Sequence, residues 1–155
     1  FWSAKDEVRK VWMSLYTPQM GEVSEERLTP ADRQRVVGDL MELRRRFPKL
    51  EAPEGMLKVY AEPPQSPSEC VFARSTTTVS ADLATRIEPC QFGGTPDCAS
   101  CGCVASAGLG AIARHMLWGV IPVGSIYTGS VAVGERMRRR RDKETDDEAV
   151  AAASA

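Results

Sequence analysis

Five cysteines are the residues of this sequence best able to do chemistry. They are Cys70, Cys90, Cys98, Cys101 and Cys103, and the last four fall within residues 90–103. An odd number fits a framework of paired disulfides poorly. Dense cysteines in an otherwise ordinary, charged chain favour a metal site over disulfides. The chemistry to expect is therefore that of metal-bound thiolates.

The spacing of the last three cysteines suits one metal centre. Cys98, Cys101 and Cys103 place three thiols in a short stretch, and the C-x2-C pair lets two sulfurs reach one centre from a single turn. Gly102 lets the backbone bend between the last two without a Cβ clash, and the glycines at 93–94 give similar freedom upstream. Iron–sulfur clusters commonly take four cysteine thiolates. The triplet therefore supplies most of a ligand set for such a cluster.

A predicted β-hairpin brings the other two cysteines to this triplet. STTTVS (75–80) and TRIEP (85–89) are β-favouring arms, and Asp82 stabilises the turn between them. Cys70 precedes the hairpin and Cys90 follows it, so closure of the hairpin makes them neighbours. Structural zinc is the alternative, although a four-cysteine zinc ribbon usually has a second C-x2-C pair, which this sequence lacks. From the residues alone, three alternatives stay open: an iron–sulfur cluster, zinc, and disulfides or free thiols.

Residues 1–50 predict one β/α unit upstream of the cysteines. Residues 8–16 have apolar side chains on both faces, as a strand buried on two sides requires. Thr29 is the expected N-cap of a helix with Pro30 at its first position, and Pro48 ends that helix. Its apolar face holds Val36, Val37, Leu40, Met41, Leu43 and Phe47, and its polar face holds Arg33, Asp39, Glu42 and Arg45.

The rest of the chain divides by composition. Residues 51–69 hold four prolines and predict a connector between two bodies. Residues 70–137 predict the hairpin, the cysteine loop and two docking helices, at 104–117 and about 123–138. The tail, 138–155, is basic, then acidic, then alanine-rich, and predicts disorder.

Composition narrows the class of protein. The chain has 155 residues, 43% of them apolar, and a net charge of −1, so bulk charge points neither to nucleic acid nor to a membrane surface. The uncharged run 116–133 contains glycines and a proline, and we read it as a buried segment of a soluble protein rather than a membrane span. No secretory signal is visible, so a cytoplasmic location is expected. The sequence contains no Ser-His-Asp arrangement, P-loop or dinucleotide fingerprint.

The run CVFARSTTTVSADLATRIEPCQFGGTPDCASCGC resembles the auxiliary-cluster (SPASM or Twitch) region of radical S-adenosylmethionine enzymes. In that region one cysteine opens a hairpin, a second follows it, and a cysteine-dense loop closes the site, as Cys70, Cys90 and the triplet do here. Upstream, KVWMSLYTPQMGE followed by LTPADRQRVVGDL resembles a late β/α unit of the partial (β/α)6 barrel of these enzymes. Together the resemblance spans roughly residues 8–117.

The resemblance implies an α/β fold, with the C-terminal β/α unit of such a barrel followed by a small hairpin-plus-helix auxiliary domain. Five cysteines imply one [4Fe–4S] cluster with one cysteine to spare, and the cluster would anchor substrate or relay electrons. In a barrel, the loop after a strand's carboxyl end faces the active site, which would place Thr17, Gln19 and Glu22 near substrate or S-adenosylmethionine.

The resemblance also implies what must lie elsewhere. The C-x3-C-x2-C motif that binds the catalytic cluster and S-adenosylmethionine is absent from this sequence. It would lie in an N-terminal barrel half, so this chain by itself is not expected to cleave S-adenosylmethionine. The parent enzyme would need a reductant such as flavodoxin or ferredoxin and would act on a peptide or a small molecule. Neither nucleic acid nor a membrane is an expected partner.

Overall fold

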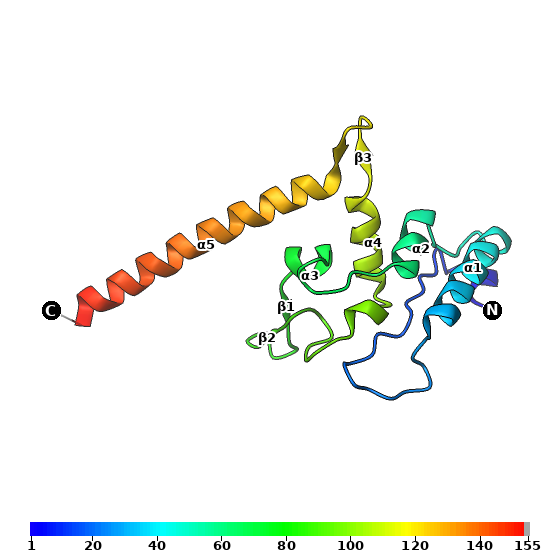
Figure 1. The fold of residues 1–155 in the computed structure, drawn as a ribbon, viewed down its shortest axis with the longest axis horizontal. Helices are drawn as coiled ribbons and strands as arrows, with labels where there is room; N and C mark the ends of the chain where they lie inside the picture. The colour runs from blue at the N-terminus through cyan, green and yellow to red at the C-terminus, as the bar shows by residue number, and fades with distance from the viewer. Residues whose placement is uncertain (154–155) are drawn as a thin grey trace.

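Three helices form the core of the computed structural model, which describes residues 1–153. They are α1 (Pro30–Arg46), α2 (Glu54–Ala61) and α4 (Val104–Ala113), and α2 packs against both of the others (Figure 1). The buried side chains are Val37, Leu40, Ala52, Met56, Leu57, Val59, Tyr60 and Ala107. The body of the molecule is therefore helical, and its loops carry the cysteines.

Helix α1 begins where the sequence predicts. The Thr29 hydroxyl accepts a hydrogen bond from the Asp32 amide at 3.1 Å, and Pro30 occupies the first helical position, where its missing N–H is not needed. Val37 and Leu40 face the core. Arg33 was expected on the polar face, but its side chain is buried, because residues 33, 37 and 40 lie on one stripe of the helix.

The predicted connector at 51–69 contains the best-buried helix, α2, so that prediction is wrong for residues 54–61. Leu57 has no exposed surface. Pro53 is the N-cap residue and Pro63 follows the C-cap, so the prolines bound the helix instead of preventing it. Small residues let α4 approach closely: a Cβ added at Gly110 would lie 3.2 Å from the Val59 side chain.

Residues 8–16 do not form the predicted strand. They run as an extended segment with a single parallel bridge, in which the Val11 amide donates to the Lys49 carbonyl at 2.8 Å and the Glu51 amide donates to the Val11 carbonyl at 2.9 Å. Trp12 is about half exposed, so the segment is not buried on both sides. The sheets within the described residues have two strands each, and the fold is mixed helix and small antiparallel sheet.

The hairpin between Cys70 and Cys90 forms, but it is short. Strand β1 (Thr78–Val79) pairs antiparallel with β2 (Arg86–Ile87), and a five-residue helix, α3 (Val71–Ser75), precedes it. The Asp82 carboxylate closes the turn by accepting hydrogen bonds from the Ala84 and Thr85 amides, both at 2.9 Å. These bonds and one from the Thr85 hydroxyl hold the pKa of Asp82 well below its usual range.

The C-terminal third departs most from prediction. The helix expected over 104–117 ends at Ala113, and a second hairpin, β3 (Met116–Leu117) with β4 (Ile121–Pro122), follows. Trp118 at its turn is 87% exposed, so the run 116–133 is not a buried segment. Within the part of the chain that the structure describes, no helix has the length and apolar character that a membrane crossing needs.

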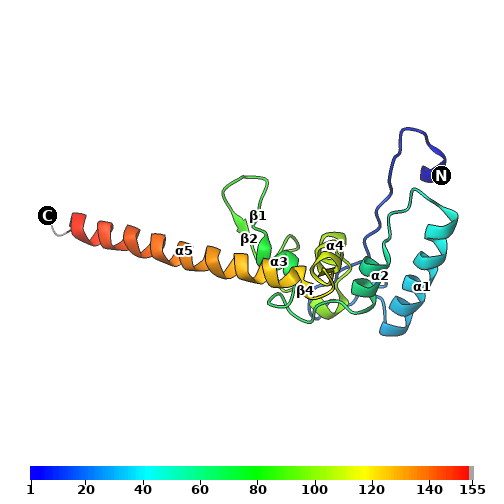
Figure 2. The same ribbon diagram turned by 90° about the horizontal axis from the view of Figure 1, so that it is seen from above.

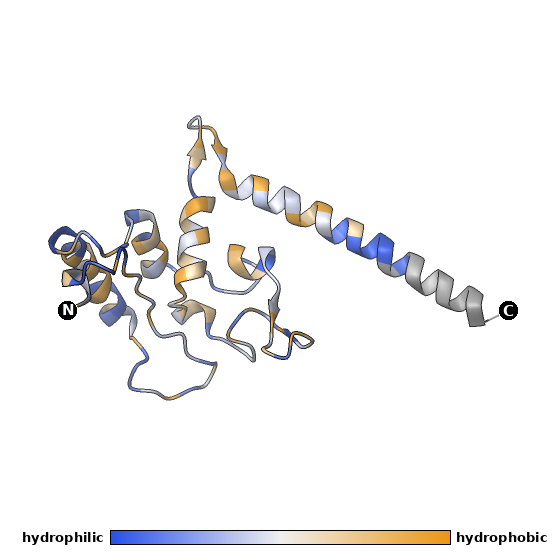
Figure 3. Cartoon of the chain, turned by 180° about the vertical axis from the view of Figure 1, so that it is seen from behind, coloured by the Kyte–Doolittle hydropathy of each residue, from blue (hydrophilic) through white to orange (hydrophobic). Residues whose placement is uncertain are grey.

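Helix α5 (Val123–Ala153) projects away from the body of the molecule (Figures 1 and 2). Its first turns are mixed in hydropathy and its middle is hydrophilic (Figure 3). The tail predicted to be disordered is helical as far as Ala153, and residues 154–155 lie outside the described residues. Beyond Gly134 the sequence has no Gly or Pro and is rich in Arg, Lys, Glu and Ala, which favour helix.

The extended segment before α1 lies against the cysteine loop. That loop includes a short 3-10 helix, η2 (Cys98–Ser100). A second short 3-10 helix, η1 (Trp2–Ala4), lies at the start of the chain. The Leu15 amide donates to the Gly102 carbonyl at 2.9 Å, and the Asp97 amide donates to the Pro18 carbonyl at 2.8 Å. These contacts join residues far apart in sequence. They fix the loop that presents three of the cysteines.

Candidate metal centre

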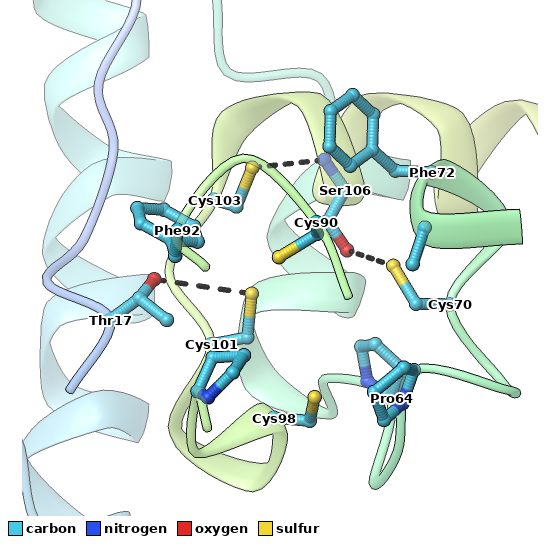
Figure 4. Close-up of a pocket in the computed structure, with 13 residues that line it drawn as sticks. Thr17, Pro64, Cys70, Phe72, Cys90, Phe92, Cys98, Cys101, Cys103 and Ser106 are labelled. Carbon is cyan, nitrogen blue, oxygen red and sulfur yellow. Dashed lines mark hydrogen bonds between the residues drawn. The ribbon is translucent and has the colours of Figure 1, made fainter. Parts of the chain in front are cut away.

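All five cysteines line one pocket. Cys70 is the N-cap residue of α3, Cys90 follows strand β2, and Cys98, Cys101 and Cys103 lie in the loop that leads into α4 (Figure 4). Every one is a free thiol. The hairpin therefore brings the two isolated cysteines to the triplet, as its position in the sequence predicts.

The wall of the pocket is otherwise mostly apolar. Two aromatic rings and three prolines complete it: Phe72, Phe92, Pro64, Pro67 and Pro96. Cys70 and Cys103 are buried, and the other three thiols are partly exposed. An apolar wall lowers the local dielectric, which disfavours charged thiolates unless a cation compensates them.

The sulfur of Cys103 is held by the start of α4. Cys103 is the N-cap residue, and its Sγ accepts a hydrogen bond from the Ser106 amide at 3.4 Å. The Gln91 side-chain amide also donates to this sulfur, at 3.1 Å. The Ser106 hydroxyl lies 3.2 Å from the sulfur of Cys70. Donors to the sulfurs are one of the means by which a protein sets the potential of an iron–sulfur cluster.

The environment raises the pKa of three of the thiols. Burial, together with the neighbouring groups of Cys101, Cys70, Cys90 and Asp97, raises the pKa of Cys98 to about 11. Burial is also the largest cause of the raised pKa values of Cys101 and Cys103, and backbone N–H groups oppose it at both sites. Because several thiolates cannot share this pocket without a cation, binding of a metal would displace protons.

The loop after residue 16 was expected near substrate, and its three candidate residues have different surroundings. Thr17 is buried and lines the cysteine pocket. Its hydroxyl accepts a hydrogen bond from the Gly102 amide at 2.9 Å and points at the sulfur of Cys101, 4.0 Å away. Gln19 accepts from the Thr95 amide at 2.8 Å through its side-chain oxygen. Of the three, Thr17 alone lies at the pocket.

Glu22 closes its own turn. Its carboxylate accepts from the Gln19 amide at 2.7 Å and from the Tyr16 hydroxyl. These two hydrogen bonds, that from Tyr16 first, lower the pKa of Glu22. Gln19 and Glu22 therefore shape the segment that carries Thr17, and neither lines the cysteine pocket.

Gly102 sits between two ligand candidates for a reason that the sequence does not show. Its backbone lies against that of Leu15, and an added Cβ would come within 3.0 Å of the Leu15 backbone carbon and oxygen. The close approach, rather than bending alone, requires glycine here. Gly93 and Gly94 do have positive φ angles, of 61° and 59°, as expected for a loop that needs glycine.

Arg33 belongs to the site although sequence reasoning assigned it to the surface. Its guanidinium donates to the carbonyls of Ser100 at 2.6 Å and Cys101 at 2.9 Å. It also donates to the Tyr60 carbonyl at 3.0 Å, so it ties the C-x2-C loop to α2. The signal was its spacing from Val37 and Leu40, which places it on the buried stripe of α1.

The sulfurs surround the pocket rather than meet at one point. Figure 4 shows them spread around its wall. Among the described residues, no three side chains of His, Cys, Asp or Glu are arranged as ligands of a single metal ion. The thiols therefore line one pocket without the arrangement of a preformed site for a single metal ion.

No protein-family model, no curated protein and no solved structure matches this chain. The cysteine pocket combines three features: five free thiols around its wall, an otherwise mostly apolar lining, and donors that face the sulfurs.

Proposed function

We propose that the cysteine pocket holds one [4Fe–4S] cluster and that the chain is the auxiliary-cluster region of a radical S-adenosylmethionine enzyme. One observation carries the proposal: thiols from three separate segments, Cys70, Cys90 and the loop 98–103, converge on a single pocket without forming disulfides. Four thiolates satisfy such a cluster. The fifth cysteine is then spare, or its place is taken by substrate at one iron.

The surroundings support a cluster over a single zinc ion. A four-cysteine zinc site needs its sulfurs about 2.3 Å from one point. Here the thiols come from three segments around the wall of one pocket. The apolar rings of Phe72 and Phe92 in that wall suit a redox group whose potential depends on its shielding from water.

A [4Fe–4S] cluster supplies one-electron chemistry or an iron atom that binds substrate. The residues of this chain would hold and shield it. The Ser106 amide and the Gln91 side chain donate hydrogen bonds to the sulfur of Cys103. The Thr17 hydroxyl points at the sulfur of Cys101. The segment 15–20, which the structure lays against the cysteine loop, would form the side of the site nearest the rest of the enzyme.

The remainder of the parent enzyme is part of the same proposal. The catalytic cluster and S-adenosylmethionine would be bound by an N-terminal barrel half that carries the C-x3-C-x2-C motif. A flavodoxin or ferredoxin would supply electrons in the cytoplasm, and a peptide or small molecule would be the substrate. These assignments rest on the resemblance of the sequence, and the cysteine pocket supports only the auxiliary cluster.

Anaerobic reconstitution of the chain with iron and sulfide tests the cluster. We expect a brown protein with broad visible absorbance and about four irons per chain. Serine substitution at each cysteine in turn should abolish or alter the cluster at four positions and leave it at the spare one, and Ser75→Ala, on the exposed end of α3, is the control. A colourless protein with one zinc per chain would exclude the cluster and leave a zinc-stabilised binding module.

A further inference from the structure

Arg33 carries a buried positive charge directly beneath the cysteine loop. The residue is 5% exposed, and its guanidinium makes three hydrogen bonds, all to backbone carbonyls: those of Tyr60, Ser100 and Cys101. Among the side chains that the structure describes, no salt bridge joins Arg33 to a carboxylate. A buried charge is costly unless other groups compensate it, and backbone carbonyls carry only partial negative charge.

The groups around Arg33 show which negative charge could compensate it. The Asp97 carboxylate acts on it electrostatically, but Asp97 pairs with Arg27 at 2.5 Å and accepts from the Ser100 hydroxyl at 3.0 Å. Two of the three carbonyls that Arg33 contacts belong to Ser100 and Cys101, so its charge lies against the loop whose cysteines would be thiolates in a metal site. Burial lowers the pKa of Arg33, but a guanidinium stays protonated in proteins.

We infer that Arg33 is the countercharge of the bound cluster and raises its reduction potential. This inference rests on the proposed function, because it needs the cluster to be present. Four thiolates more than cancel the positive charge of the iron–sulfide core, so a cysteine-ligated cluster is an anion, and reduction makes it more negative. A fixed cation nearby favours the reduced form more than the oxidised form.

Arg33 acts through position and charge rather than by contact with the reacting atoms. Its hydrogen bonds to Ser100 and Cys101 fix the loop between two of the ligand candidates, and its charge acts across that loop. A merely structural residue would hold the loop without moving the potential. The two roles are separated by a substitution that keeps the charge and another that removes it.

The experiment compares reduction potentials of reconstituted protein by titration followed in visible absorbance and electron paramagnetic resonance. Arg33→Gln should lower the potential so that the ratio of reduced to oxidised cluster falls about tenfold at fixed solution potential, which is 59 mV for one electron. Arg33→Lys should shift it much less, because the charge is kept. Arg35→Gln, on the exposed side of α1, is the matched control and should leave it unchanged.

Each outcome decides between the possibilities. A loaded Arg33→Gln protein with the potential of the original chain overturns the inference while leaving the cluster itself in place. A loaded Arg33→Lys protein shifted as far as the Gln variant also overturns it. If only the Lys variant loads iron and keeps its potential, the inference is supported. Loss of iron from both variants with helix content intact would make Arg33 purely structural, and a colourless original chain would refute the cluster as well.

Discussion

Replacement of Gly102 by alanine tests whether the extended segment must lie against the cysteine loop. A methyl group at this position would come within 3.0 Å of the Leu15 backbone, which cannot move aside as a flexible side chain could. The two segments must therefore separate. Separation breaks the Leu15–Gly102 backbone hydrogen bond and the bond from the Gly102 amide to the Thr17 hydroxyl.

The size of the effect follows from those contacts. Overpacking a tight site costs about 1–3 kcal/mol, and each of the two lost hydrogen bonds costs about 1 kcal/mol, so the Gly102→Ala protein should lose about 3–5 kcal/mol of unfolding free energy. The control is Gly108→Ala, in the interior of α4, where nothing lies within 4 Å of the added methyl. That change should stabilise the chain by about 0.5–1 kcal/mol.

Urea unfolding of the metal-free protein, followed by circular dichroism, measures both changes, and iron counting after reconstitution measures the site. We expect Gly102→Ala to unfold at lower urea and to load less iron, and Gly108→Ala to do neither. Gly102→Ala could instead unfold at the same urea concentration as the original chain and bind its full complement of iron. The contact between Leu15 and the cysteine loop would then be required neither for stability nor for the site, and the reasoning would be wrong.

Three further changes have defined outcomes. Leu57→Ala empties a fully buried position of α2 and should cost about 2–5 kcal/mol in urea unfolding. Thr17→Val leaves the buried Gly102 amide without its acceptor and should cost about 1–3 kcal/mol, whereas Thr17→Ser, which keeps the hydroxyl, should cost clearly less; equal losses would contradict this. Because the folded pKa of Asp82 is depressed, its contribution is present above its unfolded pKa near 3.8 and is lost as the pH falls from there through the lower folded pKa. In NMR spectra the Thr85 amide signal should therefore hold its position as the pH falls through 3.8 and shift only at lower pH, and in Asp82→Asn it should show no such shift.

Local chemistry made part of the fold predictable. The Thr29 cap with Pro30 set the start of α1, and the β-favouring arms around Asp82 set the hairpin, because each depends on hydrogen bonds among near neighbours. The convergence of Cys70 and Cys90 on the triplet followed from the hairpin. The expected strand at 8–16 failed because a strand needs a partner, and in the described residues only Leu50 bridges to it.

Other elements could not be deduced from composition. Prolines at 53 and 63 suggested a connector, although the eight residues of α2 between its bounds supply the core. Charge alone assigned Arg33 to the surface, and its burial depends on carbonyls of a loop more than sixty residues away. The role of Thr17 likewise depends on a distant amide, so neither residue could be placed without the tertiary structure.

The contact between Thr17 and Gly102 joins positions 85 apart along the chain. Closing so long a loop carries an entropic cost that no local structure offsets, and contacts of this span form late in folding. During synthesis Thr17 is made 85 residues before Gly102, so their contact cannot form until that stretch of chain exists. The cysteine pocket therefore cannot be complete before the loop 98–103 and the start of α4 have been synthesised.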